Sequence, residues 1–475
     1  MNLVKNIFET FCVSFIVFFI LIVNKAEAHV SERALVLLLP TEFYIPAGLS
    51  VLILTIFISY ITPISFISSI FLPYEITKVY SSNKTTLFLE NTLKTITSLI
   101  SFFLLFLLVL AGIYGSRDPL DNPLPLFIWT VWFMMMPIIQ ILVGNFWSYA
   151  NPWYGIAKII FKGKSIYRYP SKFIFFPPSI GFLLFALFML VYIAPDDPDR
   201  LAIVVMIYWG LNFFLIRVFG FQWLEKGECF SVFYNLLSKL SCFWIENGKL
   251  FVGLFGSQLR NINNLPVSSV LFLSIILATL SFDGLNETFW WFSVIDVNPL
   301  EFYGRSSVYT ENTLGLILFV MFLLIIFSLT IFVGHFILEE NINFRDIIGI
   351  NAISLLPIAL AYHIAHYLTS FIVNIQYAYK VSSDPFGMGS DYFNFGNYNV
   401  TTSFFNTIDS VKLIWLVQAS SIVAGHVLAI LLAHSISSNY LKTKKSVLIS
   451  QFPISLFMVG YTFLGLWILS SPTVG

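Results

Sequence analysis

The sequence predicts an all-α fold, a polytopic membrane bundle of about ten transmembrane helices behind an N-terminal signal peptide. Of the 475 residues, 58% are hydrophobic and only 11% are charged, whereas a soluble domain carries about 25% charged residues. The apolar residues gather in segments of about the 20 residues that a helix needs to cross a bilayer. The net charge is zero and no long basic run occurs. This balance argues against nucleic acid as a partner and leaves the lipid bilayer as the expected one.

The first stretch of the chain, 1–28, has the three parts of a secretory signal. Lys5 supplies the positive region, an apolar stretch follows, and an A-x-A cleavage signal ends at Ala28. Cleavage would leave 29–475 as a single transmembrane helical domain that begins outside the cytoplasm at His29. The alternative is an uncleaved first helix. A terminal amino group together with the imidazole of the same residue suits Cu(II), so His29 is a weaker candidate metal ligand.

Ten later segments are apolar enough to span a membrane. They are 44–61, 96–114, 126–143, 173–194, 201–219, 267–282, 314–338, 347–379, 412–435 and 447–469. The sixth segment is short and the eighth is long. Because proline removes a helix hydrogen bond, we expect Pro357 to kink the eighth segment.

The orientation follows from the basic residues. With residue 29 outside, Lys and Arg gather in the loops that the helix order places inside, for example Lys158, Lys162, Lys164 and Arg168. The outside loops are mainly acidic or neutral, which is the bias of the positive-inside rule. The sequence therefore predicts a multi-pass protein of a bacterial cytoplasmic (inner) membrane whose mature N-terminus lies outside the cytoplasm.

Three loops differ from simple linkers. The inside loops 145–160 and 230–255 mix aromatic and apolar residues with sparse lysines, which is the pattern of amphipathic helices that lie in the membrane interface. Asn151-Pro152 predicts a turn or a helix start in the first of them. The outside loop 381–410 is rich in turn-forming residues, so we expect a folded cap over the outer mouth of the bundle.

Histidines inside two apolar segments are the best indication of function. His363 and His366 lie three residues apart, on one helix face, and His426 lies at a similar depth on the next segment. Titratable groups at this depth usually face the bundle interior or a cavity. Three imidazoles suit copper or zinc, and two on facing helices could also hold a haem iron, which fits less well. The alternative is that each imidazole only fixes helix packing.

Other polar residues are weaker candidates. His335 and His434 stand near the inner ends of their helices, where they could form a second metal site or simply contact headgroups and loops. Asp283 and Glu287, four residues apart at the outer end of the sixth segment, could accept a cation or form a helix-end pair. The sequence contains no phosphate-binding loop, nucleophile elbow or zinc-protease motif in a suitable context.

Several short motifs, in order along the chain, resemble one known family. They are AHVSERALVLLLPTEFYIPAG at 28–48, Asn151-Pro152-Trp153, Ser281-Phe282-Asp283-Gly284-Leu285, YHIAHY at 362–367, Asp384-Pro385-Phe386-Gly387, Gly425-His426-Val427 with Ala433-His434, and VGYTFLGL at 459–466. Together they are similar to the bacterial multi-pass membrane proteins known as fenitrothion hydrolases. The resemblance runs from the signal to the last helix and implies hydrolysis of an organophosphorus ester. It brings no catalytic residues with it.

Three hypotheses follow. The first is a membrane protein that handles copper or zinc at a His363, His366 and His426 site. The second is a metal-assisted hydrolase of a small apolar ester, with a metal-bound water as nucleophile. The third is a small-solute or proton-coupled transporter, or a structural membrane partner whose histidines only pack. Titration near neutral pH makes histidine a suitable proton carrier.

Overall fold

The computed structural model of this chain describes residues 41–78, 84–170, 174–246, 248–262, 265–301, 304–338 and 343–473. The predicted signal peptide, 1–28, and the candidate ligand His29 lie outside the described residues. The fold below is therefore that of the chain from residue 41 onward.

The fold is almost entirely helical. The α-helices are α2 (Thr41–Ile61), α3 (Ile64–Ile70), α4 (Lys84–Tyr114), α5 (Pro123–Pro125), α6 (Met136–Val143), α7 (Trp147–Ala150), α8 (Tyr154–Phe161), α9 (Phe176–Leu190), α10 (Pro198–Phe219), α11 (Gln222–Lys226), α12 (Cys229–Ser238), α13 (Ser268–Leu285), α14 (Phe289–Val294), α15 (Tyr309–Phe336), α16 (Phe344–Ala352), α17 (Leu355–Val381), α18 (Ile408–Ser437) and α19 (Lys444–Ser470). A π-helix, η1 (Leu126–Met135), and the 3₁₀ turns η3 (Leu259–Asn261), η4 (Pro299–Glu301), η5 (Arg305–Val308) and η6 (Ser403–Phe405) complete the helical elements.

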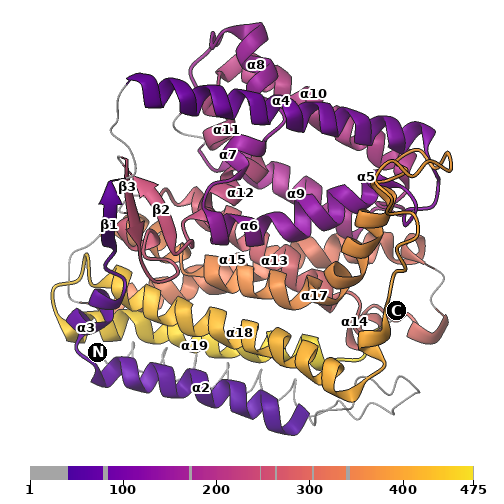
Figure 1. The fold of residues 1–475 in the computed structure, drawn as a ribbon. Coiled ribbons are helices and arrows are strands. Elements are labelled where there is room, and N and C mark those ends of the chain that lie inside the picture. The colour runs from indigo at the N-terminus through magenta and orange to yellow at the C-terminus, as the bar shows by residue number, and fades with distance from the viewer. Residues whose placement is uncertain are drawn as a thin grey trace.

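The predicted membrane bundle is confirmed. Within the part of the chain that the structure describes, nine helical spans are long and apolar enough to cross a membrane. They coincide with nine of the ten predicted segments. The remaining segment, 173–194, forms α9, which has only 15 residues. Figure 1 shows the long helices side by side, with α2 and α4 at opposite edges of the bundle.

The eighth predicted segment is broken near its beginning. It forms α16 and α17, separated at Ile353 and Ser354. The Ser354 hydroxyl donates to the carbonyl of Asn351, 2.7 Å away, and Pro357 lies in the first turn of α17. Proline is tolerated there because first-turn N–H groups have no partner within the helix. The expected kink at Pro357 is thus realised as a break just before it.

The prediction of a single interfacial helix over 230–255 is wrong. The 230–255 region forms α12 followed by the strands β2 (Phe243–Glu246) and β3 (Lys249–Val252), which pair antiparallel. Strand β1 (Tyr74–Lys78) pairs with the other edge of β3, giving the order β1-β3-β2. Asn247-Gly248 stands between β2 and β3 in the sequence, a dipeptide favoured in tight hairpins. Helix α12 is buried over most of its length and belongs to the core.

The other predicted interfacial helix forms in two pieces, α7 and α8. They are separated at Asn151-Pro152, as the sequence predicts. The Asn151 side chain accepts a hydrogen bond from the N–H of Tyr154, 3.0 Å away, at the start of α8. The Ser98 hydroxyl of α4 donates to the Asn151 carbonyl at 2.6 Å. These bonds hold the pair of short helices against α4.

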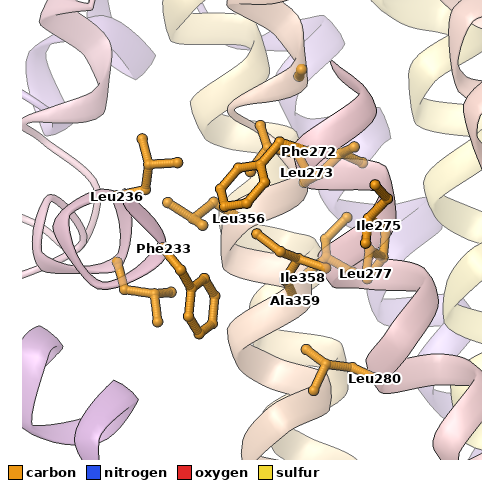
Figure 2. Close-up of a cluster of buried hydrophobic side chains, with 14 of the residues drawn as sticks. Phe233, Leu236, Phe272, Leu273, Ile275, Leu277, Leu280, Leu356, Ile358 and Ala359 are labelled. Carbon is orange, nitrogen blue, oxygen red and sulfur yellow. The ribbon is translucent and has the colours of Figure 1, made fainter. Parts of the chain in front are cut away.

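Helix α13 is the centre of the bundle. Its side chains are buried on every side, as expected for a helix that is apolar all round. Figure 2 shows Phe272 and Ile275 of α13 in a cluster with Phe233 of α12 and Leu356 of α17. In a membrane the apolar side chains leave lipid and not water, so close packing supplies most of the stability of such a cluster.

The bundle has two different ends. The β1-β3-β2 sheet lies at one end, called the sheet end here, and α5 and α14 lie at the other (Figure 1). Two basic residues of the predicted inside loops, Lys78 of β1 and Lys249 of β3, lie in this sheet. The end with α5 and α14 carries the site described next.

Candidate functional site

A partly open cavity of about 640 Å³ lies at the end of the bundle opposite the sheet. Side chains of η1, α13, α17 and α18 line it, together with loop residues before α10 and the start of η5. This volume lies within the range of about 300–1,000 Å³ that small-molecule sites occupy. The folded loop between α17 and α18 contributes no lining residue, so the cap predicted over 381–410 does not form a wall of the cavity.

An acid–imidazole pair lies in the cavity. His366 Nε2 of α17 is 3.1 Å from Asp283 Oδ2 of α13, which makes an ion pair when the imidazole is protonated. The hydroxyl of Tyr367 donates to the same carboxylate oxygen. The Asp283 side chain is 14% exposed and that of His366 is 26% exposed. A carboxylate so deep in an apolar bundle is tolerated only when such partners compensate the lost hydration.

A glycine allows the two helices to bring this pair together. A Cβ placed on Gly284 would lie 2.7 Å from Ile468 Cγ2 and 3.5 Å from His366 Nδ1. The first distance is too short for a side chain unless Ile468 of α19 shifts. Glycine after Asp283 therefore lets α13 approach both α17 and α19 closely. It also leaves His366 Nδ1 facing Gly284, a residue that itself lines the cavity.

Three further charged residues line the same cavity. Burial raises the pKa of Glu287 above its usual range, and the neighbouring carboxylate of Asp283 raises it further. Burial also raises the pKa of Asp196, against the opposing effect of Arg305. Arg305 Nη1 donates to the carbonyl of Met189 at 2.8 Å, which anchors η5 at the end of α9. The cavity thus combines paired and unpaired acidic groups.

The π-helix η1 forms an aromatic wall. It contributes Trp129, Thr130 and Phe133 to the cavity lining. Among the described residues, Trp129 Nε1 and Thr130 Oγ1 are buried without a hydrogen-bond partner, and Thr130 is 0% exposed. Buried polar atoms are rarely left unpaired unless water or a ligand completes them. Water or a ligand in the cavity could complete the hydrogen bonding of these two atoms.

The π-helical stretch has an identifiable cause. It precedes Pro137, which has no N–H and whose ring clashes with a carbonyl one turn earlier in an α-helix. The N–H of Met136 accordingly donates to the carbonyl of Val131, five residues back. Side chains satisfy carbonyls freed around this point, with the Tyr234 hydroxyl donating to that of Trp132 at 2.6 Å. Segments of π-helix occur frequently at functional sites.

The structure places the predicted histidine ligands in separate surroundings. His363 Nε2 lies 3.0 Å from the carbonyl of Met134, on the η1 side of α17. His426 is fully buried and its Nδ1–H donates to the carbonyl of Ile422 in its own helix, 2.8 Å away. Across the described ranges, no three His, Cys, Asp or Glu residues come together as a group that could hold a metal. The copper or zinc expected at these histidines stays a prediction without a formed site.

Two of the three weaker histidine candidates, His335 and His434, are not among the residues that line the cavity. His434 is 0% exposed, and its Nδ1–H donates to the carbonyl of Ile430 at 2.9 Å. The expectation that it contacts headgroups is therefore wrong. His335 is half-buried and its ring centroid lies 5.9 Å from that of Phe344.

Most residues of the cavity lack a strong signal in the sequence. Asp283 and Glu287 stand at the outer end of an apolar segment, where a helix-end pair explains them as well as a cation site does. Tyr367, Arg305 and Thr130 carried no distinguishing pattern. Their roles depend on which helices meet, and nothing in their sequence spacing reveals that.

Comparison with protein-family models, curated proteins and solved structures finds no match to this chain. The fold and the cavity define a helical multi-pass membrane protein with an acidic, partly open cavity. Its function is therefore argued from these residues.

Proposed function

We propose that this protein is a membrane transporter that binds a small solute in the cavity and couples binding to a proton. The observation that carries the proposal is the His366–Asp283 pair, held at 3.1 Å inside a cavity of a membrane bundle. Ionisable residues in apolar spans are costly and commonly mark substrate or proton pathways. A pair that only fixed packing would not need to line a cavity.

The residues have distinct roles in this proposal. Asp283 holds the imidazole of His366 and stabilises its protonated form, while the Tyr367 hydroxyl fixes the carboxylate. Glu287, whose pKa is raised by loss of hydration and by the carboxylate of Asp283, keeps its proton to higher pH than a free glutamate does. A solute that changes the charge or hydration of the cavity would shift both protonation equilibria, and that linkage is what coupling requires.

The other end of the bundle supplies a barrier. At the sheet end of α17–α19, the Asn351 amide of α16 donates to the Tyr440 hydroxyl at 2.8 Å, and Gln451 donates to Ser437. These buried polar contacts join α16, α18 and α19. Hydrogen bonds of this kind can exchange for water when helices move apart, so we place the inner gate here. The charge bias of the loops favours a cavity mouth outside the cytoplasm.

The test uses proteoliposomes that enclose the pH-sensitive dye pyranine. Choline, glycerol and methanesulfonate, which differ in charge, are added outside in turn, and internal pH is recorded. We expect at least one solute to move protons with the wild-type protein and not with His366→Gln. The matched control is His335→Gln, a histidine in the last turn of α15 that does not line the cavity. It should behave as wild type. Equal signals from wild type, His366→Gln and empty liposomes with every solute would refute proton-coupled transport.

A second candidate is the ester hydrolysis that the fenitrothion hydrolase resemblance implies. One observation favours it: with Nε2–H directed at Asp283, the imidazole of His366 keeps Nδ1, which faces Gly284 of the cavity lining, free to act as a base. A water oxygen would attack phosphorus, its proton would pass to Nδ1, and the P–O bond to the aryl group would break to release an aryl oxide. Release of 4-nitrophenol from 4-nitrophenyl dimethyl phosphate, abolished in His366→Ala, would support it. No turnover above the uncatalysed rate would reject it.

A further inference from the structure

The charged side chains that line the cavity carry more acidic than basic groups. Three are carboxylates, and only one arginine and one histidine stand against them. The imidazole of His366 offsets Asp283. The guanidinium of Arg305 lies near Asp196 and donates one hydrogen bond to the backbone carbonyl of Met189. In the described part of the chain no ion pair within 4 Å joins Glu287 to a cation, so one carboxylate lines the cavity without a close positive partner.

We propose that the solute is a small organic cation whose ammonium group binds against the carboxylates of Glu287 and Asp283. This inference rests on the proposed function, since it names the solute class of the same cavity. A cation completes the charge balance that the protein leaves open. A positive group that enters a partly dehydrated acidic cavity gains more from each carboxylate than it would in water.

The aromatic lining fits the same class of solute. Trp129, Phe133, Tyr367 and Trp415 all line the cavity. The face of an aromatic ring attracts an ammonium group, most strongly for tryptophan, and more so when the group is shielded from water. An anion would meet the same faces with repulsion, and a neutral solute would gain only dispersion.

The unpartnered polar atoms of η1 add a hydrogen-bonding requirement. Thr130 Oγ1 can donate or accept, and Trp129 Nε1–H can only donate. Both are buried in the cavity wall. A solute with a hydroxyl or another oxygen besides its ammonium group would satisfy them, so we expect a cation that also carries such an acceptor.

The test compares three probes of nearly equal shape by calorimetric titration of the purified full-length protein. Choline is the cation; 3,3-dimethyl-1-butanol has carbon in place of its nitrogen and no charge; 3,3-dimethylbutanoate is an anion. We expect choline to bind about tenfold more tightly than the alcohol, the size of a shielded cation–π and charge contribution. Equal binding of choline and the alcohol, tighter binding of the anion, or no binding of choline would overturn the inference.

Variants separate charge from folding. Glu287→Gln should weaken choline binding by about tenfold and leave the alcohol unchanged, whereas Glu287→Asp should keep most of the preference. Glu301→Gln, an exposed glutamate in η4, is the matched control and should bind as wild type. Choline-selective binding without proton movement would reject transport and leave the solute class standing. Proton movement driven only by glycerol or methanesulfonate would support transport and reject an organic cation as the solute.

Discussion

The most informative substitution is Asp283→Asn, which removes a charge and keeps the shape. Asparagine can still accept a hydrogen bond from Tyr367, so the main loss is the charged contact with His366, 3.1 Å long. Removing one partner of a fully buried pair costs about 3–5 kcal/mol. The two side chains here keep 14% and 26% exposure, and that access to water reduces the penalty. We therefore expect a loss of about 1–3 kcal/mol in unfolding free energy.

The size of the contact itself follows from a double-mutant cycle. Asp283→Asn, His366→Gln and the double variant are unfolded with denaturant in the same detergent, and the coupling free energy is the deviation from additivity. We expect a coupling of about 1–2 kcal/mol. Asp121→Asn, an exposed carboxylate at the same end of the bundle, controls for the change in charge. A coupling free energy near zero would show that the pair does not form in the protein and would undo the argument for the site.

Three further predictions concern packing, pH and metal. Gly425→Ala should destabilise the protein by about 1–3 kcal/mol, because its Cβ would lie 2.3 Å from that of Ala361 on α17; Gly210→Ala, with open space around it, is the thermal-unfolding control. Folding raises the pKa of Glu287. Its protonation therefore stabilises the folded protein fully below the ordinary carboxyl pKa, and this stabilisation is lost as pH rises through the raised pKa. Glu287→Gln should therefore flatten the dependence of unfolding free energy on pH in that window and stabilise the protein at neutral pH. Because the three histidines predicted as ligands lie apart, elemental analysis should find the same copper and zinc content in the wild type and in a variant lacking them. Stoichiometric metal that is lost in the variant would support the metal site.

The membrane spans could be predicted because their signal is local. A helix of about 20 apolar residues satisfies its own backbone hydrogen bonds wherever its neighbours lie. The breaks at Asn151-Pro152 and near Pro357 are local for the same reason, since proline lacks an N–H in any context. The hairpin after α12 also had a local signal, the dipeptide Asn247-Gly248. The region was nevertheless predicted as an interfacial helix because it is rich in apolar and aromatic residues.

The site could not be predicted in the same way. His363 and His366 share a helix face by spacing, yet one contacts a carbonyl of η1 and the other a carboxylate of α13. Which partner each meets depends on how far α17 is rotated and how closely α13 approaches, and apolar periodicity in lipid does not set either. For His426 the rotation of α18 turns the ring into its own helix, away from the cavity.

By itself the sequence determined the class of the protein, the positions of its spans and the bias of its loops, because hydrophobicity and charge act residue by residue against the bilayer. Only the tertiary structure decided that Asp283, and not His426, is the partner of His366, and that Thr130 and Glu287 belong to the same cavity. Those pairings depend on close approach at small residues such as Gly284 and on the π-helical stretch before Pro137. Both are properties of helices packed against one another, so they have no counterpart in a single segment of the chain.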